Sequence, residues 1–236
     1  MTGKLELADE FVSFGRTIYN RGHPSELQQL VQAVVFFGQM LHHRQYISGT
    51  DGTLSVRVGS DRALATCSEI CKRFLTPDDL VLVDLAGNQL SGSRKPSSEL
   101  HHHLSIYKRR SDVNAVVHAY PCSAMGLASD GLDLTEAVCS ELVLTLDEVP
   151  LARYAPSGSP ELHESLNSLI EKHDAILLEH RGVVTCGNTL DRAYMNMEVV
   201  EHCARIALVA RTLGGCKTLD AAAVSRLRAQ KSKRCL

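Results

Sequence analysis

The sequence predicts an α/β fold in which helices cover a mostly antiparallel central sheet. Segments with apolar residues at helical spacing are interleaved with short apolar or alternating runs, and several of those runs follow each other across a tight turn. Runs joined in this way form hairpins, so we expect helices layered on a largely antiparallel sheet. The 236 residues contain no repeat, low-complexity stretch or flexible linker, and we expect one domain over 1–236.

The predicted helices begin at residues that satisfy the free backbone amides of a first turn. The segment Pro24-Ser25-Glu26 opens the first helix, which is expected to end near Ser48. Ser97 and Ser98 are expected to cap a second helix, which continues to Arg110. Further helices are predicted from Pro121 onward, over 161–172 and over 190–213.

The predicted strands are short, and turn residues separate several of them. A run that alternates in polarity covers 53–58, and Gly59-Ser60-Asp61 turns the chain into the next run. The apolar run before His118 indicates a buried strand. Strands are expected at 53–58, 62–66, 81–84, 115–118, 175–178 and 183–185.

Composition narrows the class of protein. A hydrophobic content of 44% and a charged content of 22% are ordinary for a globular chain, and a net charge of −2 gives no reason to expect nucleic-acid binding. The basic stretch Arg226–Arg234 is predicted to be a solvated helix. No apolar run approaches the roughly 18 residues of a membrane span, and Met1–Glu10 does not resemble a signal peptide. We therefore expect a cytoplasmic protein whose eight cysteines are reduced thiols.

The eleven histidines raise the question of a metal site. The consecutive histidines 101–103 would point about 100° apart on a helix, so they cannot ligate one ion together. Surface or packing roles are the favoured interpretation for each of them. His118 ends an apolar β run, where α/β folds place binding groups, and His180 lies in a polar interruption just before Gly182.

Among the single residues, Glu99 is the strongest candidate for a catalytic role. It follows two serines at the start of a predicted helix, and helix capping alone would explain all three residues. The same geometry also suits catalysis, because free amides and hydroxyls bind an anion while a carboxylate beside them moves a proton.

Five segments occur together in a recognisable order. They are GTDGTLS (49–55), LTPDDL (75–80), KPSSEL (95–100), NAVVH (114–118) and LLEHRG (177–182). Together they resemble the class II aldolase/adducin family over about residues 28–213, and KPSSEL is the most specific of them. The family includes fuculose-phosphate, ribulose-phosphate and rhamnulose-phosphate aldolases, related decarboxylases and dehydratases, and the non-catalytic adducin head.

The resemblance implies roles for individual residues. Glu99 corresponds to the glutamate that donates and accepts the proton and that can also touch the metal. His118 corresponds to the first histidine of a metal-binding His-x-His pair. The positions that hold the substrate phosphate in the family correspond here to Gly52, Thr53, Ser68, Ser97 and Ser98.

The metal site departs from the family pattern at two positions. Tyr120 stands where the second histidine is expected, and Arg181, preceded by His180, stands where the third is expected. Arginine has no lone pair to give, and tyrosine ligates only when it is deprotonated. A divalent metal, zinc by default, would then depend on His118, Tyr120, His180 and Glu99. In a metal-free alternative, Arg181 supplies the positive charge that stabilises an enolate.

The phosphate loops carry two unexpected carboxylates, Asp51 and Glu69. At about 4 Å and an effective dielectric constant near 20, each like-charge contact with a phosphate costs roughly 4 kcal/mol. Phosphate binding therefore requires these side chains to turn outward, and a substrate without phosphate is the alternative.

The function predicted from these residues is that of a class II aldolase-like lyase. Its substrate would be a small polar carbonyl or sugar-phosphate-like compound, and its reaction aldol cleavage or decarboxylation with Glu99 as proton shuttle. The alternative is a non-catalytic member, like the adducin head, that kept the fold and lost the metal. The resemblance also implies a homotetramer with fourfold symmetry and sites between neighbouring subunits, and neither nucleic acid nor membrane is expected as a partner.

Overall fold

A computed structural model of the protein describes residues 25–155, 165–166 and 168–234. The chain divides into two compact units. Unit 1 extends to Val117 and includes Asn188–Leu190, whereas unit 2 comprises His118–Gly187 and the residues from Asp191 onward. A single domain over the whole chain stays a prediction.

Unit 1 is built on antiparallel strands. Their order is β4-β3-β2-β1-β5, and the pairs β1–β2, β2–β3 and β3–β4 are all antiparallel. The strands are β1 (Thr53–Val58), β2 (Arg62–Thr66), β3 (Leu80–Asp84), β4 (Gln89–Ser91) and the start of β5 (Ala115–Ala119). The predicted strands 53–58 and 62–66 are confirmed to the residue, whereas the exposed edge strand β4 was not predicted.

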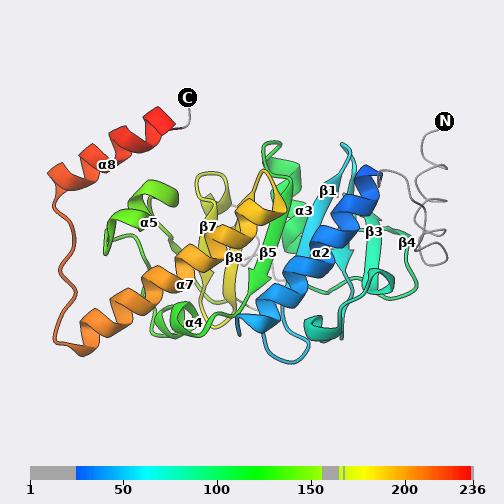
Figure 1. Ribbon diagram of the computed structural model, residues 1–236, viewed down its shortest axis with the longest axis horizontal. Coiled ribbons are helices and arrows are strands. Elements are labelled where there is room, and N and C mark those ends of the chain that lie inside the picture. Colours follow the sequence, from blue (N-terminus) through cyan, green and yellow to red (C-terminus); the bar gives the residue numbers. More distant parts are fainter. Residues whose placement is uncertain (1–24, 156–164, 167, 235–236) are drawn as a thin grey trace. The chain divides into compact units, whose positions relative to one another are not determined.

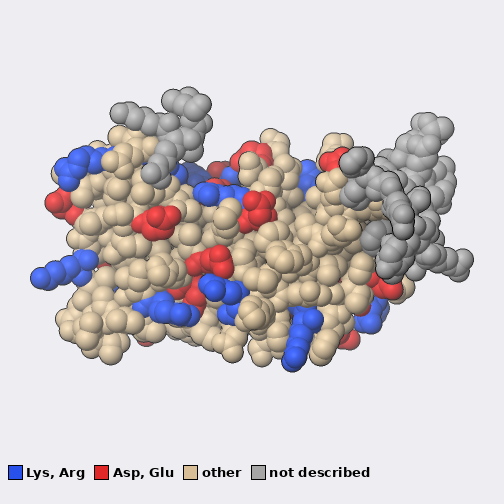
Figure 2. All heavy atoms as spheres, in the orientation of Figure 1, with Lys and Arg blue, Asp and Glu red and all other residues tan. Residues whose placement is uncertain are grey.

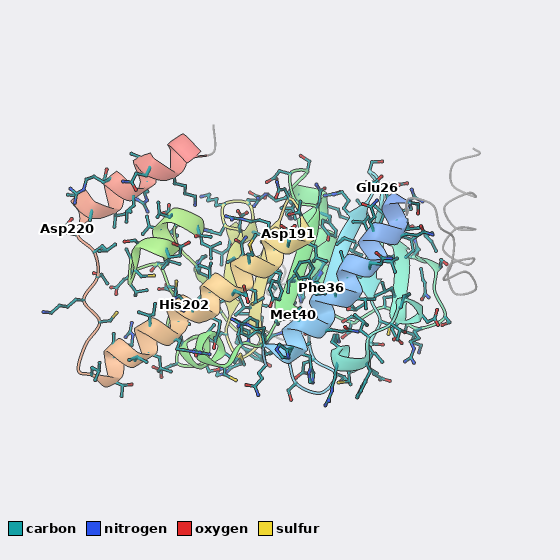
Figure 3. The ribbon with its side chains drawn as sticks, viewed as in Figure 1. Glu26, Phe36, Met40, Asp191, His202 and Asp220 are labelled. Atoms are coloured by element: carbon teal, nitrogen blue, oxygen red, sulfur yellow. The ribbon has the colours of Figure 1, made fainter. Side chains whose placement is uncertain are left out.

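Helix α2 (Glu26–His43) packs against β1, β2 and the short 3-10 helix η1 (Lys72–Phe74) of unit 1 (Figure 1). Ser25 and Gln28 form a reciprocal capping box at its start. The helix ends at His43 rather than near Ser48, because Gln45 takes a left-handed conformation with φ of 61°. The labelled side chains of α2 in Figure 3 include Phe36, which remains 55% exposed.

Helix α3 (Leu100–Arg109) begins one residue later than its sequence pattern suggests. Glu99 occupies the N-cap position that the sequence pattern gives to a serine, and its side chain makes no capping hydrogen bond. The prediction that Ser97 and Ser98 cap it is therefore wrong. Ser97 instead contributes a backbone carbonyl, which accepts from Leu100 N at 3.1 Å, and this leaves its hydroxyl for other partners. A second 3-10 helix, η2 (Pro77–Asp79), precedes β3.

Unit 2 contains a mixed set of strands. Their order is β8-β7-β6, with β7–β8 antiparallel and β6–β7 parallel, so the sheet is not purely antiparallel. The elements are α4 (Cys122–Ser129), α5 (Ser140–Thr145), β6 (Leu151–Ala152), β7 (Ala175–Leu178), β8 (Gly182–Gly187), α7 (Leu190–Thr212), which starts at the end of unit 1, and α8 (Ala221–Arg234). Asp191 lies in the first turn of α7 and Asp220 precedes α8 (Figure 3). The C-terminal helix is confirmed, whereas the predicted helix 161–172 falls partly outside the described residues.

Surface composition agrees with the even charge balance. Acidic and basic side chains are interspersed over the described part of the face drawn in Figure 2. None of the helices in the described ranges combines the length and apolar composition that a membrane span requires. The seven cysteines within those ranges are free thiols, as expected.

Candidate active site

In unit 1, alternate residues of β1 bind the segment that contains Glu99 and α3. Side chains two apart on a strand point to the same side of the sheet. The first of these residues is Thr53. Its hydroxyl lies 2.7 Å from the Ser97 hydroxyl and donates to Glu99 Oε2 at 3.3 Å. Thr53 is fully buried, so its hydroxyl has a fixed position from which to orient the half-buried carboxylate of Glu99.

The second of these β1 residues is Ser55, in the middle of the strand. Its hydroxyl lies 2.8 Å from His103 Nδ1 and 2.8 Å from the Tyr107 hydroxyl, and all three side chains are buried. His103 is therefore a core histidine that joins α3 to β1, which favours the packing interpretation of the 101–103 cluster.

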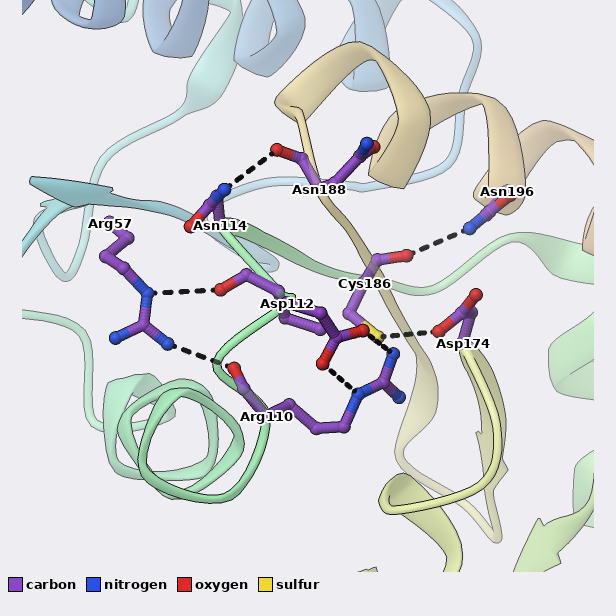
Figure 4. A network of polar contacts seen from close by, with 9 residues as sticks. Arg57, Arg110, Asp112, Asn114, Asp174, Cys186, Asn188 and Asn196 are labelled. Atoms are coloured by element: carbon purple, nitrogen blue, oxygen red, sulfur yellow. Dashed lines mark hydrogen bonds and ion pairs between the residues drawn. The ribbon is translucent and has the colours of Figure 1, made fainter. Parts of the chain in front are cut away.

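The third of these β1 residues is Arg57, which binds the C-terminal end of α3. Its Nη2 atom donates to Arg110 O at 3.1 Å (Figure 4). The same atom donates to Tyr107 O at 2.7 Å, and Nε donates to Val113 O at 3.1 Å. The guanidinium also lies over the Tyr107 ring at 4.8 Å. These three residues of β1 attach both ends of α3 to the strand. Glu99 lies at the N-terminal end of the helix, where Thr53 makes its contact.

The residues expected to hold phosphate lie at the start of β1, after β2 and directly before α3. Ser68 donates from its backbone N to Lys95 O at 3.0 Å and from its hydroxyl to the same oxygen at 3.3 Å. Gly52 is buried directly before Thr53 and has φ of 79°, a conformation that suits glycine. Hydrogen bonds thus join Thr53, Ser97 and Glu99, whereas Ser68 is attached to Lys95, two residues before Ser97, and Ser98 is exposed.

Asp51 and Glu69, the two unexpected carboxylates, are both exposed. Glu69 takes a left-handed conformation with φ of 57° in the turn after Ser68. Phosphate binding requires these two carboxylates to face outward, and their exposure is consistent with that requirement.

Lys72 was missed by the sequence analysis. It lies in η1, is only 1% exposed, and donates from Nζ to Thr50 O at 2.8 Å. Burial lowers the pKa of Lys72 below its ordinary value, and the nearby Cys67, Glu99 and Asp51 oppose that shift. The available signal was a lysine within an otherwise mainly apolar segment, 70–75.

In unit 2, His118 is fully buried near the end of β5. Its Nε2 atom donates to Arg181 O at 2.7 Å. A carbonyl oxygen only accepts, so Nε2 carries a hydrogen and cannot at the same time offer a lone pair to a metal. Gly182, with φ of 87°, allows this close approach, because a Cβ there would collide with Ala119 O.

Of the other two donors of unit 2, Tyr120 lies beside His118, whereas His180 contacts a different ring. The half-buried Tyr120 places its ring centroid 5.1 Å from that of His118. His180 has φ of 57° and is exposed, and its ring contacts Tyr154 with centroids 6.1 Å apart. The regular strand that would separate His180 from Arg181 is therefore absent here, because β8 begins only at Gly182.

These positions do not fit a metal ion held by the side chains of unit 2 alone. Among residues 25–155, 165–166 and 168–234, no three His, Cys, Asp or Glu side chains are grouped so that they could hold one. The predicted set of His118, Tyr120, His180 and Glu99 draws on both units and stays a prediction.

Glu201 fixes the chain just after Tyr120. This carboxylate of α7 is 3% exposed and accepts from the backbone N of Ser123 and of Ala124, both at 3.0 Å, and from the Ser123 hydroxyl at 2.8 Å. It therefore caps the first turn of α4 from another helix, a role that no local sequence pattern indicates.

The fold and the cluster of hydroxyls around Glu99 define an α/β protein with a carboxylate beside a polar helix N-terminus. Residues 32–208 match the family described as Class II Aldolase and Adducin N-terminal domain. The chain belongs to this family, which confirms the resemblance inferred from the five segments.

Named relatives cover most of the chain. It is 34% identical over 176 residues to an L-fuculose phosphate aldolase of Methanococcus maripaludis, covering 74% of this chain and 93% of that protein. It is 32% identical over 189 residues to a 3-oxo-tetronate 4-phosphate decarboxylase of Pectobacterium atrosepticum, covering 78% and 86%. A solved structure of an L-fuculose 1-phosphate aldolase aligns with a TM-score of 0.81 at 28% identity, covering 89% of this chain and 98% of that one.

Proposed function

We propose that the protein is a class II aldolase-type lyase that cleaves or decarboxylates a small carbonyl compound carrying a phosphate group. The contact of Thr53 with both Ser97 and Glu99 carries the proposal, because it places a carboxylate within a cluster of hydroxyls and amides suited to an anion. The named relatives support it, since each acts on a compound whose name includes a phosphate.

Glu99 is assigned the proton transfer that both reactions require. Aldol cleavage and decarboxylation of a 3-oxo acid each break a carbon–carbon bond next to a carbonyl, and the electrons pass into an enolate. In aldol cleavage the hydroxyl group of the leaving fragment also gives up its proton to a base as the aldehyde forms. The enolate carbon must then receive a proton, which a positioned carboxylic acid can supply. Thr53, held by Ser97, orients the carboxyl group of Glu99 for that step.

The test is a screen of ketose 1-phosphates and phosphorylated 3-oxo acids for release of an aldehyde or of carbon dioxide. For a substrate that is turned over, Glu99→Gln is expected to lower kcat by roughly 10²–10⁴-fold. Glu171→Gln, which changes an exposed carboxylate of unit 2, is the matched control and should leave kcat unchanged. Full activity of Glu99→Gln would show that another group moves the proton.

A non-catalytic role, like that of the adducin head, is the second candidate. The replacement of two expected histidines by Tyr120 and Arg181 favours it. Absence of turnover across the whole screen, in protein supplied with divalent metals, would support this candidate over the lyase.

The finer parts of the proposal concern metal, assembly and location. If the family's metal is kept, its donors would be His118, Tyr120, His180 and Glu99, and zinc suits nitrogen and oxygen donors of this kind. A Lewis acid there would polarise the substrate carbonyl. A homotetramer, a cytoplasmic location and a role in carbohydrate metabolism complete the proposal.

A further inference from the structure

Lys72 is a charged side chain in a position that normally excludes charge. It is 1% exposed, and its stem lies beside α2, where a Cβ added at Gly38 would be 3.8 Å from Lys72 Cγ. An ammonium group removed from water is costly unless other groups compensate for the lost hydration. Within the described residues its ammonium donates one hydrogen bond, to Thr50 O at 2.8 Å. Thr50 is exposed, so water can satisfy that carbonyl without Lys72.

The charges around Lys72 belong to the candidate active site. Asp51 and Glu99 are both near enough to raise the pKa of Lys72, against the dominant effect of burial. Cys67 and Cys71 act in the same direction. Thr50, which the ammonium holds, begins the short segment that leads through Gly52 to Thr53, and Thr53 contacts Ser97 and Glu99.

We propose that Lys72 is a positioning residue that allows this turn to accept a phosphate monoester. Its ammonium holds the 50–53 segment from behind, and its positive charge opposes the carboxylates of Asp51 and Glu99. Without Lys72, a phosphate dianion beside Ser97 would lie close to the Glu99 carboxylate with no buried cation to balance the two charges. The inference rests on the proposed function for its choice of anion, but its own test measures binding rather than turnover.

The experiment measures the affinity of the full chain for inorganic phosphate by equilibrium dialysis at low ionic strength. Lys72→Met removes the charge and the hydrogen bond, whereas Lys72→Gln removes the charge and keeps an N–H donor on a side chain that is one bond shorter. Both variants are expected to weaken phosphate binding at least about tenfold. Gln39→Met is the control, because it removes a neutral tie to the same region, the hydrogen bond from Gln39 Nε2 to Leu75 O at 3.0 Å.

A purely structural lysine would give a different pattern. Phosphate affinity would then stay at the wild-type value in Lys72→Gln, or would fall equally in Gln39→Met, and either result overturns the inference. For an active protein, the inference also expects KM for a phosphorylated substrate to rise in Lys72→Gln while kcat changes less. Wild-type protein that does not bind phosphate overturns the inference even if it has lyase activity. Wild-type protein that binds phosphate through Lys72 but turns over nothing overturns the proposed function alone.

Discussion

The Thr53 hydroxyl lies 2.7 Å from the Ser97 hydroxyl and 3.3 Å from Glu99 Oε2, so one buried side chain of β1 joins the polar turn to the proposed proton-transfer group. Because Thr53 is fully buried, its hydroxyl depends on these two partners within unit 1. The relationship makes Glu99 a carboxylate of defined orientation.

Thr53→Val keeps the shape of the side chain and removes its hydroxyl. The loss of these hydrogen bonds is expected to lower kcat/KM by about tenfold, equivalent to roughly 1.4 kcal/mol of transition-state stabilisation. Steady-state kinetics on the substrate found by the screen measures the effect. Thr53→Ser, which restores a hydroxyl, should recover most of the activity, and a fully active Thr53→Val would mean that the contact with Glu99 is not used.

Arg57→Met is expected to destabilise the fold. The change leaves the carbonyls of Tyr107, Arg110 and Val113 without their shared donor and removes the cation from the Tyr107 ring. We expect a loss of about 2–4 kcal/mol in the free energy of unfolding, measured by urea denaturation. Arg109→Met, at an exposed position of α3, should change the free energy of unfolding by less than about 0.5 kcal/mol.

The buried Lys72 predicts a dependence of stability on alkaline pH. Its pKa is lowered in the folded protein, whereas the unfolded chain keeps a value of about 10.4. Between the two values the unfolded chain holds a proton that the folded chain has released, so stability rises with pH in that window. Below the folded pKa both states are protonated and the folded state bears the full cost of burial.

Lys72→Met should therefore flatten the rise of stability with pH. Burial also raises the pKa of Cys67, which contributes a fall of stability with pH, and Lys72 opposes that shift. Wild type and Lys72→Met are therefore compared in a Cys67→Ala background. The informative quantity is consequently the difference between the two slopes, obtained from urea titrations at several alkaline pH values. Equal slopes would mean that Lys72 has an ordinary pKa in the folded protein.

Metal binding is expected to be weak and to depend on His118. A zinc ion that uses Nε2 must first displace the hydrogen bond to Arg181 O. We expect binding near one ion per chain only with zinc in excess, and its loss in His118→Ala, by elemental analysis after dialysis. His202→Ala, at an exposed position of α7 labelled in Figure 3, is the control. Zinc retained at full stoichiometry without excess metal would contradict the arrangement described for unit 2.

The sequence predicted most helices and strands because their signals are local. The alternation from Thr53 to Val58 and the turn at Gly59 define β1 and β2 to the residue. The strand β6 has only two residues, Leu151–Ala152, and exists through its parallel pairing with β7. A pairing partner distant in the sequence leaves no local periodicity, so β6 could not be predicted.

The candidate site was predicted unevenly for the same reason. Ser97, Thr53 and Glu99 lie in segments whose residue types carry the family resemblance, and the structure brings them together. Lys72 and Glu201 act through burial and through partners in other elements, at Thr50 and Ser123 respectively. Neither burial nor a distant partner is visible in a residue's sequence neighbours.

Unit 1 is completed by a segment from much later in the chain. Asn188–Leu190 belongs to it, and Asn114 Nδ2 donates to Asn188 O at 3.2 Å (Figure 4). A ribosome makes the chain from its N-terminus, so residues 118–187 are synthesised before this closing segment emerges. Unit 1 therefore cannot complete its fold before unit 2 is synthesised. Its last contacts form only after much of unit 2 has been made.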